Sequence, residues 1–289
     1  MALTIGIISA GAMGSALGAR LNSQGLRVLT SLEGRSGASR SRAKAAGMLD
    51  ASDDQIMEEA SVIFSIVPPA QAIIVAQRFC TNFSNKSVGK LYVDCNAISV
   101  AKTIEIEQLF STTGVCFADG GIIGPPPRKD EEGPRLYISG DLSSDASDWL
   151  KQIKQSGVDI RFLEGPVGAS SALKLSYAGI TKGITALGAC MILAAERAGS
   201  GKFLKEELLT SQPQIMTRLS KSLPEMYSKA YRWVDEMESI SEFIGDTFPE
   251  NNIFVGAAAL FERISNDFSG SGDECAVMEK FLKRPDTES

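Results

Sequence analysis

The first twenty residues constrain the fold more than any other part of the chain. Residues 4–20 read TIGIISAGAMGSALGAR. The short apolar run at residues 5–8 is typical of a buried parallel strand. Small residues follow, and apolar residues then recur at helical spacing (Met13, Ala16, Leu17 and Leu21). A strand, a tight turn of small residues and a helix, in that order, predict a dinucleotide-binding unit.

The small residues of this turn have a physical purpose. A pyrophosphate has to approach the first turn of a helix, where backbone N–H groups lack partners. Gly11 permits the closest approach, and Gly14 allows the helix to pack against the strand. The usual G-x-G-x-x-G pattern has glycine where this chain has Ser9, so an ordinary strand–turn–helix is the alternative. We predict contacts to the nucleotide from Ser9, Ala10, Gly11, Ala12, Met13 and Gly14.

The pattern that follows predicts an α/β fold. Residues 2–165 alternate short apolar strands with helical segments, which is typical of a doubly wound parallel sheet. Strands are expected at residues 3–8, 27–31, 47–49, 61–67, 90–94, 115–119, 135–139 and 159–163. Helices are expected at residues 13–24, 40–46, 53–60, 70–83, 101–111 and 144–156.

The composition changes at Gly165 and Pro166. Residues 168–198 contain no proline and have apolar or small side chains on most sides. They predict one helix about 45 Å long, the spine of an all-helical second domain. We therefore expect a dinucleotide-binding domain at residues 1–165 and a helical substrate and dimerisation domain at residues 166–289. Further helices are expected at 204–210, 214–226, 230–238 and 254–267, with another at or after Gly245. The apolar faces of the long helix predict a homodimer.

Composition excludes several classes of function. The chain has 289 residues, a formal net charge of −6 and no histidine. The negative charge argues against a nucleic-acid surface, and no apolar run of membrane-spanning length or signal peptide is expected. The five scattered cysteines indicate a reducing, cytoplasmic compartment and no zinc site. Without histidine, Ser-His-Asp hydrolysis is excluded, and Lys, Tyr, Asp, Glu, Cys or a cofactor hydroxyl has to transfer any proton.

The segment after the second strand selects the nucleotide in such domains. Glu33 is suited to accept from a ribose 2′-hydroxyl, which would favour NAD. Arg35, with Ser36 beside it, is suited to hold a 2′-phosphate, which would favour NADP. Because Arg40, Arg42 and Lys44 make the local field positive, we favour NADP over NAD. We expect those last three side chains to form a solvated helix face.

A family resemblance covers most of the chain. The opening resembles that of the β-hydroxyacid dehydrogenase superfamily, which includes 3-hydroxyisobutyrate and 6-phosphogluconate dehydrogenases. The rest is similar to a branch in which this domain precedes its own helical C-terminal domain. The resemblance depends on five blocks in family order: Gly6 with Gly11, Met13 and Gly14; residues 67–69 (VPP); residues 93–96 (VDCN); residues 117–121 (FADGG); and residues 165–168 (GPVG) ahead of residues 173–175 (LKL).

The resemblance implies that Lys174, near the start of the long helix, is the general acid/base. A partly buried lysine beside a cationic nicotinamide has a lowered pKa and exchanges protons readily. The alternative is a lysine that snorkels from a buried helix. Val67 and Pro68 would complete the nucleotide site. Asn96, where the family has threonine, suits a hydrogen bond to substrate or to the cofactor ribose. Asp94 and Asp119 are expected to shape their own turns.

The chain also departs from the family. An asparagine usually follows the lysine by four residues, but position 178 is alanine, and Tyr177 or Thr181 are candidates to replace it. The substrate loop usually reads Ser-Gly-Gly, and here it reads Ile123-Gly124-Pro125. Two further prolines would direct Arg128 as an anion clamp, with a surface arginine as the alternative. The predicted substrate-binding residues are Asn96, Ile122, Ile123, Gly124, Arg128, Lys174, Tyr177 and Thr181.

Three functions remain open. The first is an NADP-dependent dehydrogenase or reductase of a small hydroxy acid, keto acid or related carbonyl compound. The second is an imine reductase, a related branch that commonly has aspartate or tyrosine as proton donor. Lys174 favours carbonyl chemistry, whereas Tyr177 and the lost carboxylate loop favour imines. The third is a non-catalytic nucleotide-binding protein, which Ser9, Ala178 and Ile123 favour because they stand at family motif positions.

Overall fold

The structure is a computed structural model that describes residues 3–82, 89–127 and 133–285. The chain divides into two compact units, Met1–Lys174 and Leu175–Ser289. The division falls within the long helix α7 (Ala169–Arg197), because the first turn of α7 is hydrogen-bonded to the sheet. The domain boundary after residue 165 stays a prediction.

The first unit is built on an eight-stranded sheet in the order β3-β2-β1-β4-β5-β6-β7-β8. Neighbouring strands of this sheet run parallel, except that β6 and β7 pair antiparallel. The sheet is therefore mostly parallel, as the sequence predicts, with one antiparallel pair that it does not predict. The strands are β1 (Thr4–Ile8), β2 (Arg27–Thr30), β3 (Leu49–Asp50), β4 (Val62–Ser65), β5 (Leu91–Asp94), β6 (Cys116–Ile123), β7 (Arg135–Ser139) and β8 (Asp159–Phe162).

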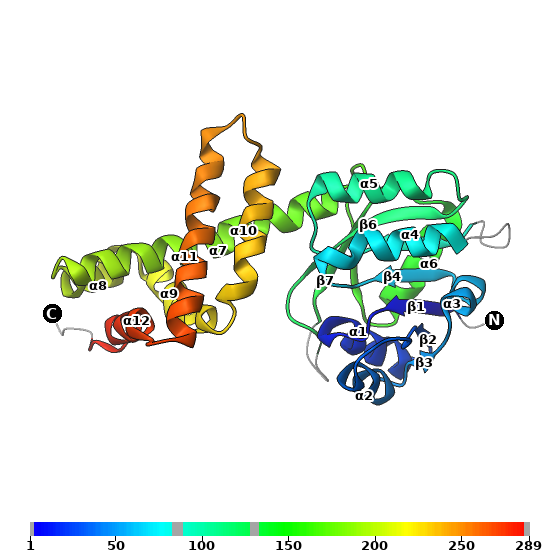
Figure 1. The fold of residues 1–289 in the computed structure, drawn as a ribbon, viewed down its shortest axis with the longest axis horizontal. Helices are drawn as coiled ribbons and strands as arrows, with labels where there is room; N and C mark the ends of the chain where they lie inside the picture. The colour runs from blue at the N-terminus through cyan, green and yellow to red at the C-terminus, as the bar shows by residue number, and fades with distance from the viewer. Residues whose placement is uncertain (1–2, 83–88, 128–132, 286–289) are drawn as a thin grey trace. The chain divides into compact units, whose positions relative to one another are not determined.

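Helices cover both faces of this sheet (Figure 1). Serines begin several of them: Ser36, Ser52, Ser99 and Ser143 each accept a hydrogen bond from the backbone N–H three residues later. Such caps satisfy amide groups that a helix start leaves unpaired. The helices are α1 (Ala12–Ser23), α2 (Gly37–Ala45), α3 (Asp53–Glu59), α4 (Ala72–Asn82), α5 (Val100–Phe110) and α6 (Ser144–Gln155), with a 3₁₀ turn, η1 (Pro69–Gln71), before α4.

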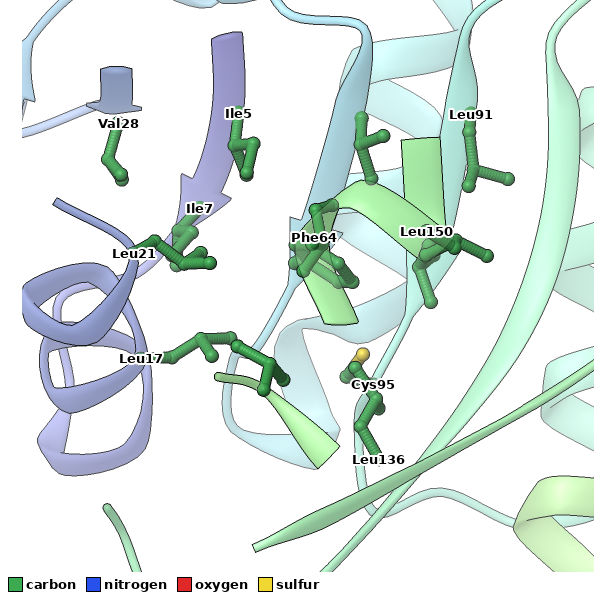
Figure 2. Packing of buried hydrophobic residues seen from close by; sticks show 14 of the residues in the cluster. Ile5, Ile7, Leu17, Leu21, Val28, Phe64, Leu91, Cys95, Leu136 and Leu150 are labelled. Atoms are coloured by element: carbon green, nitrogen blue, oxygen red, sulfur yellow. The ribbon is translucent and has the colours of Figure 1, made fainter. Parts of the chain in front are cut away.

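Each face of the sheet has its own hydrophobic core, because successive strand residues point to opposite faces. On one face, Leu17 and Leu21 of α1 pack beside Ile7 of β1 (Figure 2). On the other face, Ile8 of the same strand joins the cluster that contains Phe79 of α4. The continuous apolar runs of the strands are explained by this burial on both sides.

The second unit is entirely helical in its described residues. Trp233 of α10 packs edge-on against the buried Phe261 of α11, with ring centroids 5.2 Å apart. Gly188 of α7 lies against Leu219 of α9, where an added Cβ would come within 2.3 Å of a leucine methyl carbon. Besides α7, the helices are α8 (Gly201–Ser211), α9 (Pro213–Tyr227), α10 (Ala230–Ile244), α11 (Asn252–Ser269) and α12 (Asp273–Lys283), with a 3₁₀ turn, η3 (Pro249–Asn251), before α11. The helices predicted at residues 204–210, 214–226, 230–238 and 254–267 are confirmed, although α10 extends further than expected. Gly245 ends α10 and does not lie in a helix of its own, and no range was predicted for α12.

Helix α7 exposes several large apolar side chains, among them Ile180 and Leu187. Within the described residues, α7 is the one helix that is long and apolar enough to cross a membrane. By length and hydropathy, the expectation that no segment reaches this threshold is therefore wrong. Core helices of soluble proteins pass the same test, and α7 carries Lys174 and Lys182. The homodimer and the absence of a membrane partner stay predictions.

The contact between α1 and β1 leads to a first test. A Cβ added to Gly14 would lie 2.1 Å from the carbonyl oxygen of Ser9. Because this oxygen belongs to the backbone, it cannot move aside as the end of a flexible side chain could. Gly14→Ala should therefore lower the free energy of unfolding by about 2 to 3 kcal/mol in urea denaturation.

Gly11→Ala is the matched control. Its new Cβ would meet no described atom closer than 3.8 Å, and its φ of −68° suits any residue. This variant should lose less than about 1 kcal/mol. Equal losses in the two variants would contradict the close-packing role of Gly14.

Candidate functional site

The loop between β1 and α1 lies at the carboxyl edge of the sheet. Strand β1 pairs with β2 on one side and with β4 on the other, so the connections diverge to the two sides at this point. Ligands of open α/β sheets bind at such switch points. Gly11 is the N-cap of α1 and makes no side-chain cap, and no acidic residue occupies the first turn. The start of α1 is therefore suited to an anion.

Ser9 adopts the backbone conformation of the glycine it replaces. Its φ is +88°, and it is the one non-glycine residue in the described chain with a positive φ. This conformation is costly for a residue with a side chain and recurs at functional turns. The loop therefore has the turn geometry of the dinucleotide fingerprint despite the missing glycine.

The open space at Gly11 fits a bound pyrophosphate. Since the protein itself leaves room for a Cβ at Gly11, the fold does not require glycine there. Close approach by a ligand does require it. The predicted residues from Ser9 to Gly14 thus form one continuous loop and helix start that could hold the diphosphate of a dinucleotide.

One basic side chain contacts this loop, and others lie in and after the segment that follows β2. Arg40, Arg42 and Lys44 are exposed, as expected, and Arg42 makes one contact that was not predicted: its Nε donates to the carbonyl oxygen of Ala10 at 2.9 Å. The Nε of Arg40 donates to the backbone oxygen of Arg35 at 3.3 Å. Arg35 is half-buried, Glu33 is exposed, and Ser36 caps α2. The segment after β2 therefore leads directly into the N-terminus of α2, where the helix dipole is positive.

Asn96 joins the ends of β4 and β5. Its Nδ2 donates to Ser65 Oγ at 3.0 Å and to Asp94 Oδ2 at 2.8 Å. Its Oδ1 accepts from the Val67 N–H at 2.7 Å, and its own N–H donates to Asp94 Oδ1 at 3.0 Å. Asp94 therefore shapes its turn, as expected, and Asn96 positions Val67 ahead of Pro68. Direct contact of Asn96, Val67 or Pro68 with a ligand stays a prediction.

The sequence predicts that Asp119 shapes its own turn. In the structure, Asp119 instead anchors the start of α7. It is fully buried and accepts from the N–H of Ser171 at 2.8 Å and from its Oγ at 2.7 Å. The Ser139 hydroxyl donates to Asp119 at 3.4 Å and accepts from the Ser170 N–H at 3.0 Å. Burial raises the pKa of Asp119, and the hydrogen bonds from Ser171 oppose this rise.

Sequence reasoning missed Ser139, Ser170 and Ser171. The clamp joins Asp119 to a residue 52 positions away, which no local pattern reveals. The one available signal is the serine pair at the start of a long helix, because serine side chains favour helix starts.

Lys174 lies one turn after this clamp and is half-buried. It is near enough to Asp94 and Cys95 for its ammonium to oppose the rise of both pKa values. The pKa of Asp94 is raised to about 6, mainly by burial, and hydrogen bonds from Asn96 oppose the rise. The structure therefore brings Lys174 to the end of β5, at the same edge of the sheet as Asn96.

The predicted substrate residues are only partly brought together. Ile122 and Met13 line one small apolar pocket, and Ile123 and Gly124 line the next. Tyr177 and Thr181 belong to the second unit, and the Thr181 hydroxyl donates to the Ala178 oxygen at 3.3 Å. Arg128 lies outside the described residues. The substrate roles of all these residues stay predictions.

No described group of three or more Cys, Asp or Glu side chains is arranged to hold a metal ion.

Comparison with protein families identifies the first unit. Residues 4–167 match the NAD binding domain of 6-phosphogluconate dehydrogenase, which is more than half of the chain. The chain belongs to this family. Residues 195–264 match a domain of unknown function, DUF1932. The predicted family and fold class are thus confirmed: the chain has an NAD(P)-binding, dehydrogenase-like fold followed by a helical region.

Solved structures share this architecture. The conserved protein MTH1747 of unknown function, described as similar in structure to 3-hydroxyacid dehydrogenases, is 27% identical with a TM-score of 0.72. That match covers 93% of this chain and 99% of MTH1747. The Mycobacterium tuberculosis 3-hydroxyisobutyrate dehydrogenase is 17% identical with a TM-score of 0.68, covering 97% and 99%. An imine reductase from Myxococcus stipitatus is 20% identical with a TM-score of 0.59, covering 98% and 100%. A comparison with curated proteins finds no match.

The raised pKa of Asp94 predicts an unusual dependence of stability on pH. Its pKa in the folded protein, about 6, exceeds the ordinary value of 3.8, so the folded chain retains a proton that the unfolded chain releases. The stability that this proton contributes is complete below pH 3.8, the pKa of Asp94 in the unfolded chain. It is lost as the pH rises through about 6, the pKa of Asp94 in the folded protein.

Relative to an Asp94→Asn variant, which does not titrate here, the parent protein should lose on the order of 3 kcal/mol of unfolding free energy between about pH 4 and pH 7. Urea denaturation of both proteins across this range measures the difference. A difference that does not change with pH would show that Asp94 titrates normally.

Proposed function

We propose that the protein is an NADP-dependent oxidoreductase that transfers a hydride between the nicotinamide and a small hydroxy acid or carbonyl substrate. The observation that carries this proposal is the position of Lys174, one turn beyond the Asp119 clamp and close to Asp94 and Cys95 at the end of β5. The family match of the first unit and the fold shared with 3-hydroxyisobutyrate dehydrogenases support it.

The residues around the β1–α1 loop are suited to hold the nucleotide. The loop from Ser9 to Gly14 would take the diphosphate, and the segment with Arg35 and Ser36 would take the 2′-phosphate of NADP. The start of α2 and the arginines of that helix favour this second dianion. Glu33 is exposed, so its carboxylate can turn away into water.

The protein's own part in the chemistry is proton transfer. The bound nucleotide supplies or accepts the hydride. The Lys174 ammonium donates its proton to the substrate oxygen as a carbonyl is reduced, and the neutral amine accepts that proton in the reverse direction. The Asp119 clamp orients the helix that carries this amine, and burial around Asp94 and Cys95 keeps water from this side of the amine.

An imine reductase is the second candidate. The fold shared with the Myxococcus stipitatus imine reductase favours it, as does the exposed Tyr177 on α7. Oxidation of NADPH with keto acids, aldehydes and cyclic imines separates the two activities. Turnover of none of them would favour a nucleotide-binding protein without catalysis.

Lys174→Ala tests the proton-transfer role. The variant should lose about a hundredfold or more in kcat while its affinity for NADPH changes little, because the lysine acts on the substrate and not on the nucleotide. Steady-state kinetics and NADPH fluorescence titration measure the two quantities. Lys221→Ala, an exposed lysine of α9, is the matched control and should behave as the parent. Undiminished turnover of Lys174→Ala would remove the lysine from the mechanism.

Arg35→Ala tests the choice of nucleotide. Loss of a charge-assisted contact to the 2′-phosphate should raise the Kd for NADPH about tenfold and leave the Kd for NADH unchanged. Calorimetric titration with both nucleotides measures this difference. If the parent protein binds NADPH and NADH equally, the preference for NADP is incorrect.

A further inference from the structure

A hollow in the second unit is lined by acidic residues. It lies between α10 and α11, which pack side by side (Figure 1), and it measures about 1090 Å³, counting its open mouth. The acidic residues that line it are Glu238, Glu242, Asp246 and Glu262. No lysine or arginine of the described chain lines it. We call this hollow the acidic groove.

Helical spacing brings the acidic side chains together. Glu238 and Glu242 are one turn apart on α10 and therefore share one face of that helix. Glu262 comes from α11, on the other side of the groove. Like charges one turn apart destabilise a helix. A cation bound in the acidic groove would remove this repulsion.

The cations of the two helices are engaged elsewhere. Helices α10 and α11 contain one arginine each. The Arg232 guanidinium lies over the Tyr231 ring, 5.8 Å from its centre. The Nε of Arg263 is paired with Glu274 of α12 at 3.0 Å. Neither arginine therefore neutralises the acidic groove.

The carboxylates of the acidic groove have few partners. Glu238, Glu242 and Glu262 make no hydrogen bond or ion pair with any other residue that the structure describes. Asp246 accepts from the Nδ2 of Asn251 at 3.4 Å, which is a neutral donor. A cleft lined by one sign of charge raises the local concentration of ligands of the opposite sign.

Ser241 gives an independent indication of a ligand. It lines the acidic groove and is only 8% exposed. Two residues earlier, the Ser239 hydroxyl donates to the carbonyl oxygen of Asp235 at 2.9 Å, as serines inside helices commonly do. The Ser241 hydroxyl makes no hydrogen bond with any described residue. Because a buried hydroxyl without a partner is costly, this one is suited to bind a ligand in the groove.

The arrangement favours an organic cation over a metal ion. The described carboxylates do not converge in threes, as a metal ion would need. Glu238 and Glu242 are about 6 Å apart along the helix axis, a span suited to two ammonium groups on one short hydrocarbon chain. Apolar residues line the groove between the carboxylates, among them Val234, Val255 and Ala259. Methylene groups would pack against these residues while the ammonium groups reach separate carboxylates.

We propose that the acidic groove binds an aliphatic molecule with two or more ammonium groups. Glu238, Glu242 and Glu262 hold the ammonium groups, and the Ser241 hydroxyl accepts a hydrogen bond from one of them. The hydrocarbon chain packs against the apolar residues of the groove. The proposal does not depend on hydride transfer, because the second unit alone forms the groove and its binding is measured without nucleotide.

Isothermal titration of the full chain with 1,4-diaminobutane, spermidine, butylamine and Mg²⁺ tests the proposal. The diamine and spermidine should bind saturably. The diamine should bind about tenfold more tightly than butylamine, which has the same carbon chain but one ammonium group. Glu242→Gln should weaken the binding of the diamine about tenfold, and Ser241→Ala about threefold. Neither variant should have a lower unfolding midpoint without ligand, since neither side chain makes a described hydrogen bond or ion pair.

Two variants serve as matched controls and should bind the diamine as the parent does. Glu105→Gln removes the same charge from an exposed position in the first unit, and Ser239→Ala removes a hydroxyl that does not line the groove. The proposal is overturned if Glu242→Gln binds as tightly as the parent or if Glu105→Gln weakens the binding equally. It is also overturned if butylamine or Mg²⁺ binds as tightly as the diamine, or if neither polyamine binds saturably at millimolar concentration. Equal losses in Ser241→Ala and Ser239→Ala would remove Ser241 from it.

Discussion

The hydrogen bonds between Asp119 and Ser171 are the interaction on which the candidate active site depends. They tie the start of α7 to β6 inside the protein, where no water competes for the carboxylate. Burying a charged group is costly, and it is tolerated when donors surround the group and a helix start faces it. Both conditions are met here, and Gly121 contributes by letting the backbone of Ser170 come close. Lys174 follows Ser171 by less than one turn, so its place at the end of β5 is a consequence of this clamp.

The nucleotide loop depends on a second constraint, the close packing of Gly14 against the backbone of Ser9. Gly14 packs so closely on the carbonyl of Ser9 that the chain has to reverse sharply between strand and helix. Ser9 adopts a left-handed conformation to allow this, at a cost of about 1 to 2 kcal/mol. The core beneath, with Leu17 and Leu21 against β1, is large enough to offset that cost. The result is a helix start whose amide groups face outward, with Arg42 holding the loop from the side of α2.

Much of the fold is predictable from local sequence because strands buried on both faces and amphipathic helices leave clear periodic patterns. The run at residues 5–8, the proline-free stretch at residues 168–198 and the serine before α3 all led to correct elements. The strand at residues 135–139 was predicted, but the extension of β6 to Ile123 and its antiparallel pairing with β7 were not. Periodicity shows that a segment is a strand, but neither its direction nor its neighbour. The role of Asp119 and the bond from Arg42 to Ala10 were missed because both partners lie far apart in the chain.

The sequence by itself determined the class of the protein: an N-terminal dinucleotide fold, a long helix and a helical remainder, with lysine as a candidate proton donor in a chain without histidine. Only the tertiary structure decided which groups meet. It placed Asp119 under the start of α7 and used the amide of Asn96 to join two strand ends. The physical reason is that propensity and periodicity act between neighbours along the chain, whereas hydrogen bonds and charge clusters depend on strand register and helix packing.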